Sequence, residues 1–144
     1  MKYRNGIFVI VFRKNKSKYE YLILKRKLHW KGWEFPKGGC KKGEDYLRCI
    51  KRELKEETKQ SPLSIISFNK KGKWKYPKEL SDRKNFDGQS WRLFAAELKN
   101  KNIKIDKREH EDYSWKSYSE AKKILTYKNQ KTCLKLVNDF LKKL

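Results

Sequence analysis

The run GIFVIVF at residues 6–12 is apolar at every position and rich in β-branched and aromatic side chains. Successive side chains of a strand point to opposite faces of a sheet, so a strand with this pattern has both faces buried. A second strand-like run, YEYLIL at residues 19–24, follows the polar segment KNKSK. These runs predict a sheet that begins near the first residue and is covered on both sides.

Further along the chain, the apolar pattern alternates between the period of a strand and that of a helix. Leu47, Ile50 and Leu54 form a stripe that predicts a helix from Glu44 to about Thr58, which Ser61-Pro62 stops. Residues 30–40 are rich in Gly and Pro and predict a loop with a short extended piece. We expect strands at 64–68, 72–76, 91–98 and 112–115, a polar loop at 77–90, and helices at 119–125 and 129–141, the last with a stripe of Cys133, Leu134, Val137, Phe140 and Leu141.

The length of 144 residues suits a single domain, 1–144, and the layout predicts the mixed α/β class. Lys and Arg number 39 against 17 Asp and Glu, a formal net charge of +22. This excess favours polyanionic partners such as nucleotides, nucleic acid or an acidic membrane surface. It is equally typical of a lysine-rich composition without a dedicated binding surface, so charge alone does not identify a ligand.

No apolar run approaches the roughly 20 residues of a membrane span, and the apolar stretch near the first residue is too short for a signal peptide. We therefore expect a cytoplasmic protein with no membrane association. The three cysteines, Cys40, Cys49 and Cys133, are odd in number and lack the paired spacing of a zinc site. Reduced thiols are expected, with Cys49 packed among the apolar residues of its helix.

Three glutamates lie close together on the predicted helix 44–58. Glu53, Glu56 and Glu57 stand at positions i, i+3 and i+4, so their carboxylates share one flank. Like charges arranged in this way repel, and a divalent cation such as Mg²⁺, which takes oxygen ligands, would relieve the repulsion. The alternative is a solvated acidic face paired with basic residues one turn away.

The residues before and between the glutamates favour the metal site. Gly38-Gly39 allows the backbone to approach a ligand closely, and Glu44 begins the helix where its charge suits the helix dipole. Arg52 can hold a neighbouring carboxylate through charge-assisted hydrogen bonds.

With these residues, segment 38–60 resembles the signature of the Nudix hydrolases. The positions in register are Gly38, Glu44, Arg52, Glu53, Leu54, Glu56 and Glu57. Two positions depart, because Lys59 replaces the family's glycine and Gln60 replaces its closing aliphatic residue. A lysine enters the left-handed conformation of a helix terminus at some cost, so the departure affects the turn after the helix.

The resemblance implies the Nudix fold, a mixed β-sheet sandwiched between α-helices, and hydrolysis of a P–O–P bond with Mg²⁺ or Mn²⁺. It implies that Glu53, Glu56 and Glu57 ligate the metal and that the Gly38 carbonyl adds a ligand. Either Glu53 or Glu57 would accept a proton from the attacking water, and Arg52 would orient its neighbours. The metal would withdraw charge from the phosphoryl oxygens.

Three further segments resemble the branch that contains diadenosine tetraphosphate hydrolases and bacterial RNA pyrophosphohydrolases: residues 33–39, 88–93 and 109–115. In that branch a glutamate before the tryptophan of the last strand completes the metal site, which implies Glu109, with Glu111 as the alternative. Tyr113 aligns with an aromatic residue that stacks on adenine. Trp115 is expected in the core.

Several residues near the expected cleft are candidates for holding polyphosphate oxygens, namely Lys37, Lys73, Lys75 and Tyr76. Lys37 is the strongest of them because it adjoins the signature. His29 and His110 have no partner pattern and are expected at the surface or in the core.

The preferred partner is a small-molecule nucleotide, a dinucleoside polyphosphate such as diadenosine tetraphosphate. One alternative is the 5′ end of RNA, from which the enzyme would remove pyrophosphate. Another is a weakly catalytic Nudix domain that binds nucleotides or RNA, an alternative that the intact glutamates of the signature argue against.

Overall fold

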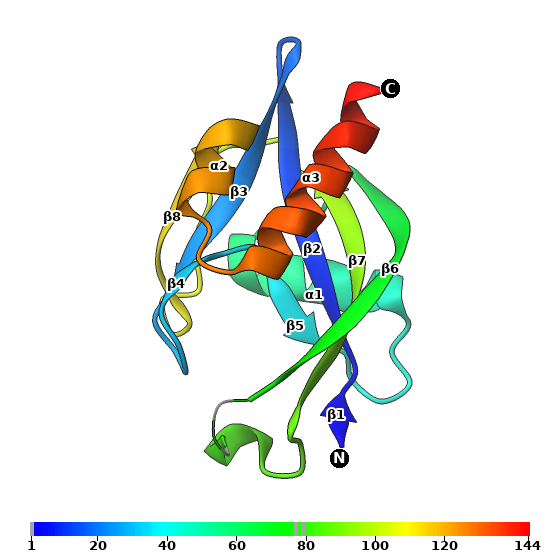
Figure 1. Ribbon diagram of the computed structural model, residues 1–144, viewed down its shortest axis with the longest axis vertical. Helices are drawn as coiled ribbons and strands as arrows, with labels where there is room; N and C mark the ends of the chain where they lie inside the picture. Colours follow the sequence, from blue (N-terminus) through cyan, green and yellow to red (C-terminus); the bar gives the residue numbers. More distant parts are fainter. Residues whose placement is uncertain (1, 77, 79) are drawn as a thin grey trace.

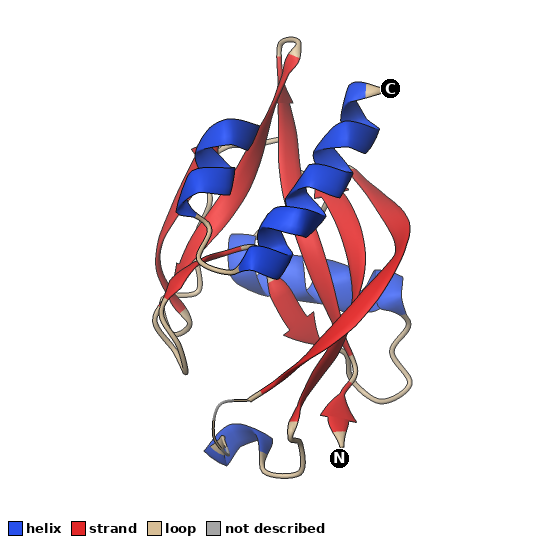
Figure 2. Ribbon diagram, viewed as in Figure 1, coloured by secondary structure: helices blue, strands red, loops and turns tan. Residues whose placement is uncertain are grey.

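Strand β2 (Gly6–Asn15), which contains the apolar run, lies in the middle of a mixed sheet (Figures 1 and 2). The computed structural model describes residues 2–76, 78 and 80–144. β2 pairs in parallel with β7 (Gly88–Glu97) and antiparallel with β3 (Lys18–Arg26). Its side chains alternate between two buried clusters, one on each face, so the predicted burial of both faces is confirmed.

β2 and β3 pair only near the hairpin that joins them, over residues 12–15 and 18–21. Beyond the hairpin they diverge, and each gains a new partner: β5 (Lys37–Gly39) pairs with β2, and β4 (Gly32–Glu34) pairs with β3. Residues 30–40 therefore contain two short strands, where the sequence predicted a loop with one short extended piece, because the freed strand edges need backbone hydrogen-bond partners. The sheet is split at this end.

The outer strands are longer than the sequence predicted. β6 (Ser64–Lys75) is one strand paired with β7, with an irregularity between Ser67 and Lys71, where polar residues suggested a break between two strands. The predicted loop at 77–90 contains a 3₁₀ turn, η1 (Ser81–Arg83), and its last residues already belong to β7; Pro77 and Glu79 of that loop lie outside the described residues. Two more strands complete the sheet, β1 (Tyr3–Arg4) beside β7 and β8 (His110–Lys116) beside β3.

Helix α1 (Tyr46–Thr58) lies on one face of the sheet, and α2 (Tyr118–Ile124) and α3 (Lys128–Lys142) lie on the other (Figure 1). The three predicted helices are thus present, and the sheet is sandwiched between them.

Asp45 caps the start of helix α1, and its side chain accepts a hydrogen bond from the Arg48 backbone. Ile50 and Leu54 are buried as predicted, but Leu47 is exposed. The apolar stripe is therefore narrower at the start of the helix than the spacing suggested, and α1 rests on the sheet mainly through its later turns.

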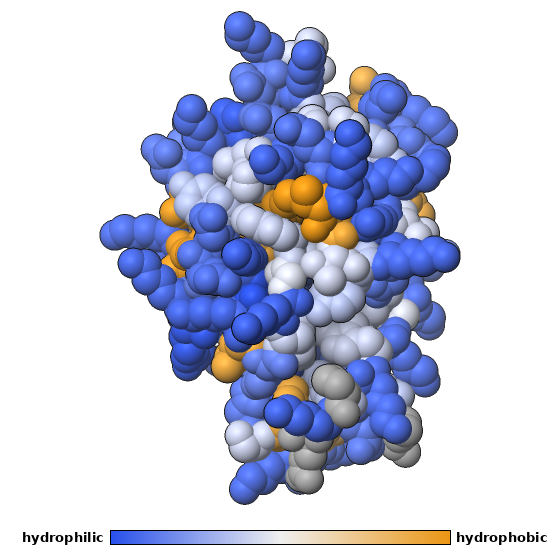
Figure 3. All heavy atoms as spheres, turned by 60° about the vertical axis from the view of Figure 1, so that its left-hand side comes forward, coloured by the Kyte–Doolittle hydropathy of each residue, from blue (hydrophilic) through white to orange (hydrophobic). Residues whose placement is uncertain are grey.

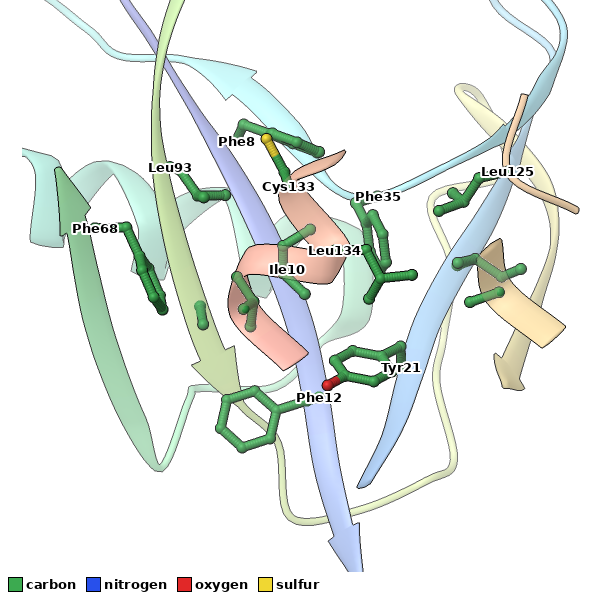
Figure 4. Packing of buried hydrophobic residues seen from close by; sticks show 14 of the residues in the cluster. Phe8, Ile10, Phe12, Tyr21, Phe35, Phe68, Leu93, Leu125, Cys133 and Leu134 are labelled. Atoms are coloured by element: carbon green, nitrogen blue, oxygen red, sulfur yellow. The ribbon is translucent and has the colours of Figure 1, made fainter. Parts of the chain in front are cut away.

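Figure 4 shows how α3 fills the cluster on its face of the sheet, with Cys133 and Leu134 pointing toward side chains of the central strands. The buried Tyr21 hydroxyl of β3 donates a hydrogen bond of 2.7 Å to Asn138 Oδ1 of α3, so its polar atom is satisfied. Phe140 departs from the predicted stripe because it is 40% exposed, and its ring contacts Phe68 edge-on.

The prediction of three reduced thiols is wrong for two of them. Cys40 and Cys49 form a disulfide, with their Cα atoms 5.3 Å apart. Cys133 is free and buried. The sequence did not reveal the pair because its proximity depends on how the chain turns back from β5 into α1, and Cys49 both packs in the core and carries the bond.

Hydrophilic side chains cover most of the face in Figure 3, with small separate hydrophobic areas, as the composition suggests. Within residues 2–76, 78 and 80–144, every helix is too short or too polar to cross a lipid bilayer.

Candidate metal and nucleotide site

Two glutamates of α1 point into the interior. The side chain of Glu53 is 13% exposed and Glu57 is 2% exposed, whereas the Glu56 side chain is 53% exposed. Neither carboxylate oxygen of Glu57 has a hydrogen-bond partner among the described residues. Glu53 lies against Gly38, where a Cβ would overlap its carboxylate. A buried carboxylate without a partner needs either a proton or a cation.

The start of β8 brings a third carboxylate to these two. Glu57, Glu109 and His110 each offer a ligand atom within 4.8 Å of the other two. Glu111 instead is exposed and pairs with Lys25, with 3.8 Å between Glu111 Oε1 and Lys25 Nζ. Of the two glutamates that the sequence left open, the structure places Glu109 beside the α1 carboxylates.

Burial and crowding of like charges raise the pKa values of both buried glutamates. Burial raises the pKa of Glu57 well above its usual range, and Glu109, Glu53 and Glu34 raise it further. Burial raises the pKa of Glu53 to about 7, opposed by Arg52 and helped by Glu56 and Glu109. A divalent cation would favour the ionised forms, and carboxylate oxygens are the ligands that Mg²⁺ and Mn²⁺ prefer. The residues present therefore fit such an ion.

Arg52 organises the polar side of α1. Its Nε and Nη2 donate to the two carboxylate oxygens of Glu44 at 2.8 and 2.9 Å, and Nη2 also donates to the Gly39 carbonyl at 2.9 Å. Its Nη1 donates to Glu53 at 3.0 Å and to Glu56 at 3.4 Å. This is the orienting position that the resemblance implied, since one guanidinium links the loop before α1 to two candidate ligands.

The two departures from the signature are accommodated in the turn after α1. Lys59 adopts the left-handed conformation, with φ 62° and ψ 23°, and its backbone N–H bonds to the Lys55 carbonyl. The Gln60 side chain donates to the carbonyls of Asn100 and Asn102, both at 3.0 Å. Gln60 thus replaces an apolar contact with hydrogen bonds to the loop 100–102, and α1 ends where the family pattern requires.

Glu34 is a functional candidate that the sequence analysis missed. It is fully buried and pairs with Lys37 at 3.1 Å, with Arg26 at 3.3 Å and with His110 at 3.1 Å, and it accepts a 2.9 Å hydrogen bond from Trp30 Nε1. Burial alone would raise the Glu34 pKa, but Lys37, His110 and Arg26 together lower it to about 2. The sequence signals were its place in the segment 33–39, which resembles the Nudix branch named above, and its position between the aromatic residues Trp33 and Phe35, but neither indicated a role for Glu34 itself.

An aromatic pocket of about 230 Å³ adjoins the carboxylates. Trp30, Lys37 and Trp74 line both this pocket and a polar cleft of about 210 Å³ that contains Glu53 and Glu109, so the two hollows share a wall. Lys37 Nζ lies 4.4 Å from the Trp30 ring centroid and 4.7 Å from that of Trp74. The pocket is lined by Phe8, Trp30, Lys37, Trp74, Lys75, Trp91, Tyr127, Asn129 and Gln130.

The candidate substrate residues have different positions. Lys37 stands at the junction of pocket and cleft, and Lys75 lines the pocket. Tyr76 is buried, and its hydroxyl accepts a 3.2 Å hydrogen bond from Arg83. Lys73 lies over the ring of Tyr3.

Tyr113 is not among the residues that line the pocket or the cleft. Its hydroxyl accepts a hydrogen bond from the Ile103 backbone at 3.4 Å, and its ring packs against the core on the α1 face. Tyr113 pairs with Leu24 across β8 and β3, and strand alternation therefore directs it away from the aromatic pocket on the opposite face. Trp115 packs against the same core, as predicted. His110 is buried, and His29 pairs with Asp82.

Comparisons with known proteins agree with this geometry. Residues 2–137 match the family described as the NUDIX domain. The RNA pyrophosphohydrolase of a Nitratiruptor species is 31% identical over 147 residues, which cover 98% of this chain and 95% of that protein. The RNA pyrophosphohydrolase of Pelagibacter ubique is 32% identical over 120 residues, which cover 78% of this chain and 74% of that protein.

Two solved structures have the same fold. A NUDIX hydrolase of Listeria monocytogenes superimposes with a TM-score of 0.79 at 25% identity, covering 96% of this chain and 94% of the other. An Ap4A hydrolase of C. elegans superimposes with a TM-score of 0.77 at 23% identity, covering 98% of this chain and 99% of the other.

Proposed function

This chain belongs to the Nudix hydrolase family, and from that premise we propose that it hydrolyses a P–O–P bond in a nucleoside diphosphate derivative at the cleft between α1 and β8. The observation that carries the proposal is the buried carboxylate of Glu57, whose two oxygens have no hydrogen-bond partner in the described part of the chain, beside Glu53 and Glu109. Glu53, Glu56, Glu57 and Glu109 would hold Mg²⁺ or Mn²⁺. The Gly38 carbonyl, which already accepts a hydrogen bond from Gln89 at 3.0 Å, would add a ligand through its second lone pair.

When bound, the metal supplies positive charge to the phosphoryl oxygens and makes water easier to deprotonate. Glu53 or Glu57 accepts the proton of the attacking water, since their carboxylates are buried beside the reacting position. Arg52 keeps Glu53 in place through its contacts with Glu44 and Gly39. Lys37 cannot act as a freely mobile cation, because it is tied to Glu34. Its role is to position one end of the substrate where the cleft meets the aromatic pocket.

The proposed substrate is an RNA with a 5′-triphosphate, which would be converted to a 5′-monophosphate with release of pyrophosphate. Relatives named RNA pyrophosphohydrolase align over nearly the whole chain, which supports this choice. The cleft also contains Arg4, Arg83 and Arg108, cations suited to phosphates beyond the reacting ones. The aromatic pocket would stack one base.

A dinucleoside polyphosphate, which the sequence analysis preferred, is the second candidate. An aromatic pocket beside a cleft suited to phosphates also fits one adenosine of such a molecule. The two substrates differ in the number of phosphates outside the reacting bridge, and this difference can be measured.

The test offers 5′-triphosphorylated RNA and diadenosine tetraphosphate separately to the purified protein with Mg²⁺, over a salt series, with identification of the products. For a single strand, the affinity falls as salt rises, and each phosphate contact makes the slope of log affinity against log salt steeper by about 0.7. We expect the RNA to yield pyrophosphate and 5′-monophosphorylated RNA. Near physiological salt, kcat/KM should be higher for the RNA than for diadenosine tetraphosphate. A higher kcat/KM for diadenosine tetraphosphate there would favour the second candidate, and the absence of turnover of both would refute the assignment.

A further inference from the structure

The disulfide between Cys40 and Cys49 lies inside the signature segment. It joins the end of β5 to the first turns of α1 and closes a loop with a sequence separation of 9. Gly38 precedes the loop by two positions, and Arg52 follows Cys49 by one helical turn. The bond is therefore flanked on both sides by residues of the proposed metal site.

The closed loop supports the contacts of Arg52. Glu44 lies within the loop and accepts a 2.9 Å hydrogen bond from the Lys41 backbone. Its carboxylate also accepts hydrogen bonds from Nε and Nη2 of Arg52. Arg52 Nη2 also lies 4.0 Å from Cys49 Sγ. Because the same guanidinium donates to Glu53, the conformation of the loop is transmitted directly to a candidate metal ligand.

The two sulfurs differ in access, since Cys40 is partly exposed and Cys49 is fully buried. A small thiolate can attack the Cys40 sulfur, which breaks the S–S bond and releases Cys49 as a thiolate that takes up a proton. A second small thiol then attacks the mixed disulfide and frees Cys40. In total, two small thiols are oxidised to one disulfide and the protein gains two thiols; the reverse exchange uses a small-molecule disulfide as oxidant.

We propose that Cys40 and Cys49 form a thiol–disulfide exchange site for small thiols and disulfides, and that closing the bond strengthens divalent-metal binding at Glu53, Glu57 and Glu109. This inference rests on the proposed function of that site. Opening the bond returns conformational freedom to the loop that holds Glu44, so Arg52 and Glu53 are less well positioned before the metal arrives.

The experiment compares protein treated with dithiothreitol and protein treated with oxidised glutathione, both freed of reagent. Thiol counting after denaturation verifies the two states. The dissociation constant of Mn²⁺ is then measured by the electron paramagnetic resonance of free Mn²⁺, an ion that prefers oxygen ligands to thiolates. We expect binding about tenfold weaker in the reduced protein, the lower end of the effect of losing a group that orients a metal ligand.

Two variants control the comparison. Cys133→Ser, in the core on the α3 face, should keep the full difference between the two states. Cys40→Ser should bind Mn²⁺ as the reduced protein does under both treatments. Equal dissociation constants in the two states, or a native protein that never forms the bond with oxidised glutathione, would overturn the inference. These outcomes need no turnover, so they are distinct from a failure to hydrolyse either nucleotide substrate.

Discussion

Glu34 Oε2 and His110 Nε2 are in contact at 3.1 Å, although 76 positions separate the two residues. Both side chains are buried, and the contact connects β4 with the first residue of β8. Because His110 follows Glu109, this pair fixes the start of β8 next to the carboxylates of α1. Glu34 also pairs with Lys37, so one buried carboxylate connects the proposed metal site with the wall of the aromatic pocket.

Replacing Glu34 with Gln should therefore damage stability and activity together. The substitution leaves Lys37 and Arg26 without their counter-charge and removes the carboxylate that contacts His110, and loss of one partner of a buried ion pair costs about 3–5 kcal/mol. Urea denaturation measures this loss, and kcat/KM should fall at a temperature where the variant is folded. Asp139→Asn, which removes an exposed pair with Lys135, is the matched control and should leave the free energy of unfolding nearly unchanged. Equal effects of both substitutions would contradict the positioning role of Glu34.

Glu57→Gln should have opposite effects on activity and on the stability of the metal-free protein. Turnover should fall by orders of magnitude because a metal ligand is lost. The metal-free variant should melt at a higher temperature than the wild type near pH 8, because a carboxyl group whose pKa is raised on folding destabilises the folded state at any pH above its unfolded pKa, and glutamine does not titrate. Calorimetry measures the melting temperature of the metal-free and the Mg²⁺-bound protein. Turnover of Glu57→Gln equal to that of the wild type at saturating Mg²⁺ would disprove the assigned site.

Glu109 and Glu111 offer a direct comparison of two neighbouring glutamates. Glu109→Gln should lower kcat and weaken Mn²⁺ binding, because Glu109 lies within reach of Glu57. Glu111→Gln removes only the pair with Lys25 and should leave both quantities near those of the wild type. A loss of kcat from Glu111→Gln alone would reverse the assignment.

The gain in thermal stability from Mg²⁺ should increase with pH. The pKa of Glu53 rises from 4.5 in the unfolded chain to about 7 in the folded metal-free protein. Between these values the folded state holds more protons than the unfolded state, so its stability falls as the pH rises. Mg²⁺ takes the place of the protons, and the shift in Tm on its addition should be larger at about pH 8 than at about pH 5. A shift independent of pH would mean that Mg²⁺ does not bind at these carboxylates.

The aromatic pocket predicts which ring contacts the base. Trp74→Ala should raise KM by about tenfold and leave kcat nearly unchanged, because base stacking contributes about 1–3 kcal/mol and acts equally in ground and transition states. Tyr113→Leu, which keeps an apolar side chain in the core on the α1 face, should leave KM unchanged. Steady-state kinetics on both variants measures the two KM values. A raised KM for Tyr113→Leu and an unchanged KM for Trp74→Ala would instead support the prediction that Tyr113 stacks on the base.

The sequence predicted the features that depend on local spacing. The periodicity of α1 placed Glu53, Glu56 and Glu57 on one flank, and the apolar run at 6–12 placed β2 in the middle of the sheet. Glu34 and the Cys40–Cys49 bond escaped prediction because their partners are set by the divergence of β2 and β3 and by the return of the chain into α1. Such long-range contacts produce no periodic pattern of residues in the sequence.

The candidate metal ligands and the residues that line the aromatic pocket lie largely on different elements of the fold. The candidate metal ligands come from α1, from β5 and from the residue just before β8, whereas most residues around the aromatic pocket come from β6, β7 and the segment entering α3. Substitutions around the pocket could therefore change which nucleotide the proposed site accepts while leaving the proposed metal ligands in place. Conversely, loss of the carboxylates would leave the aromatic pocket, and with it the proposed base-binding surface, in place.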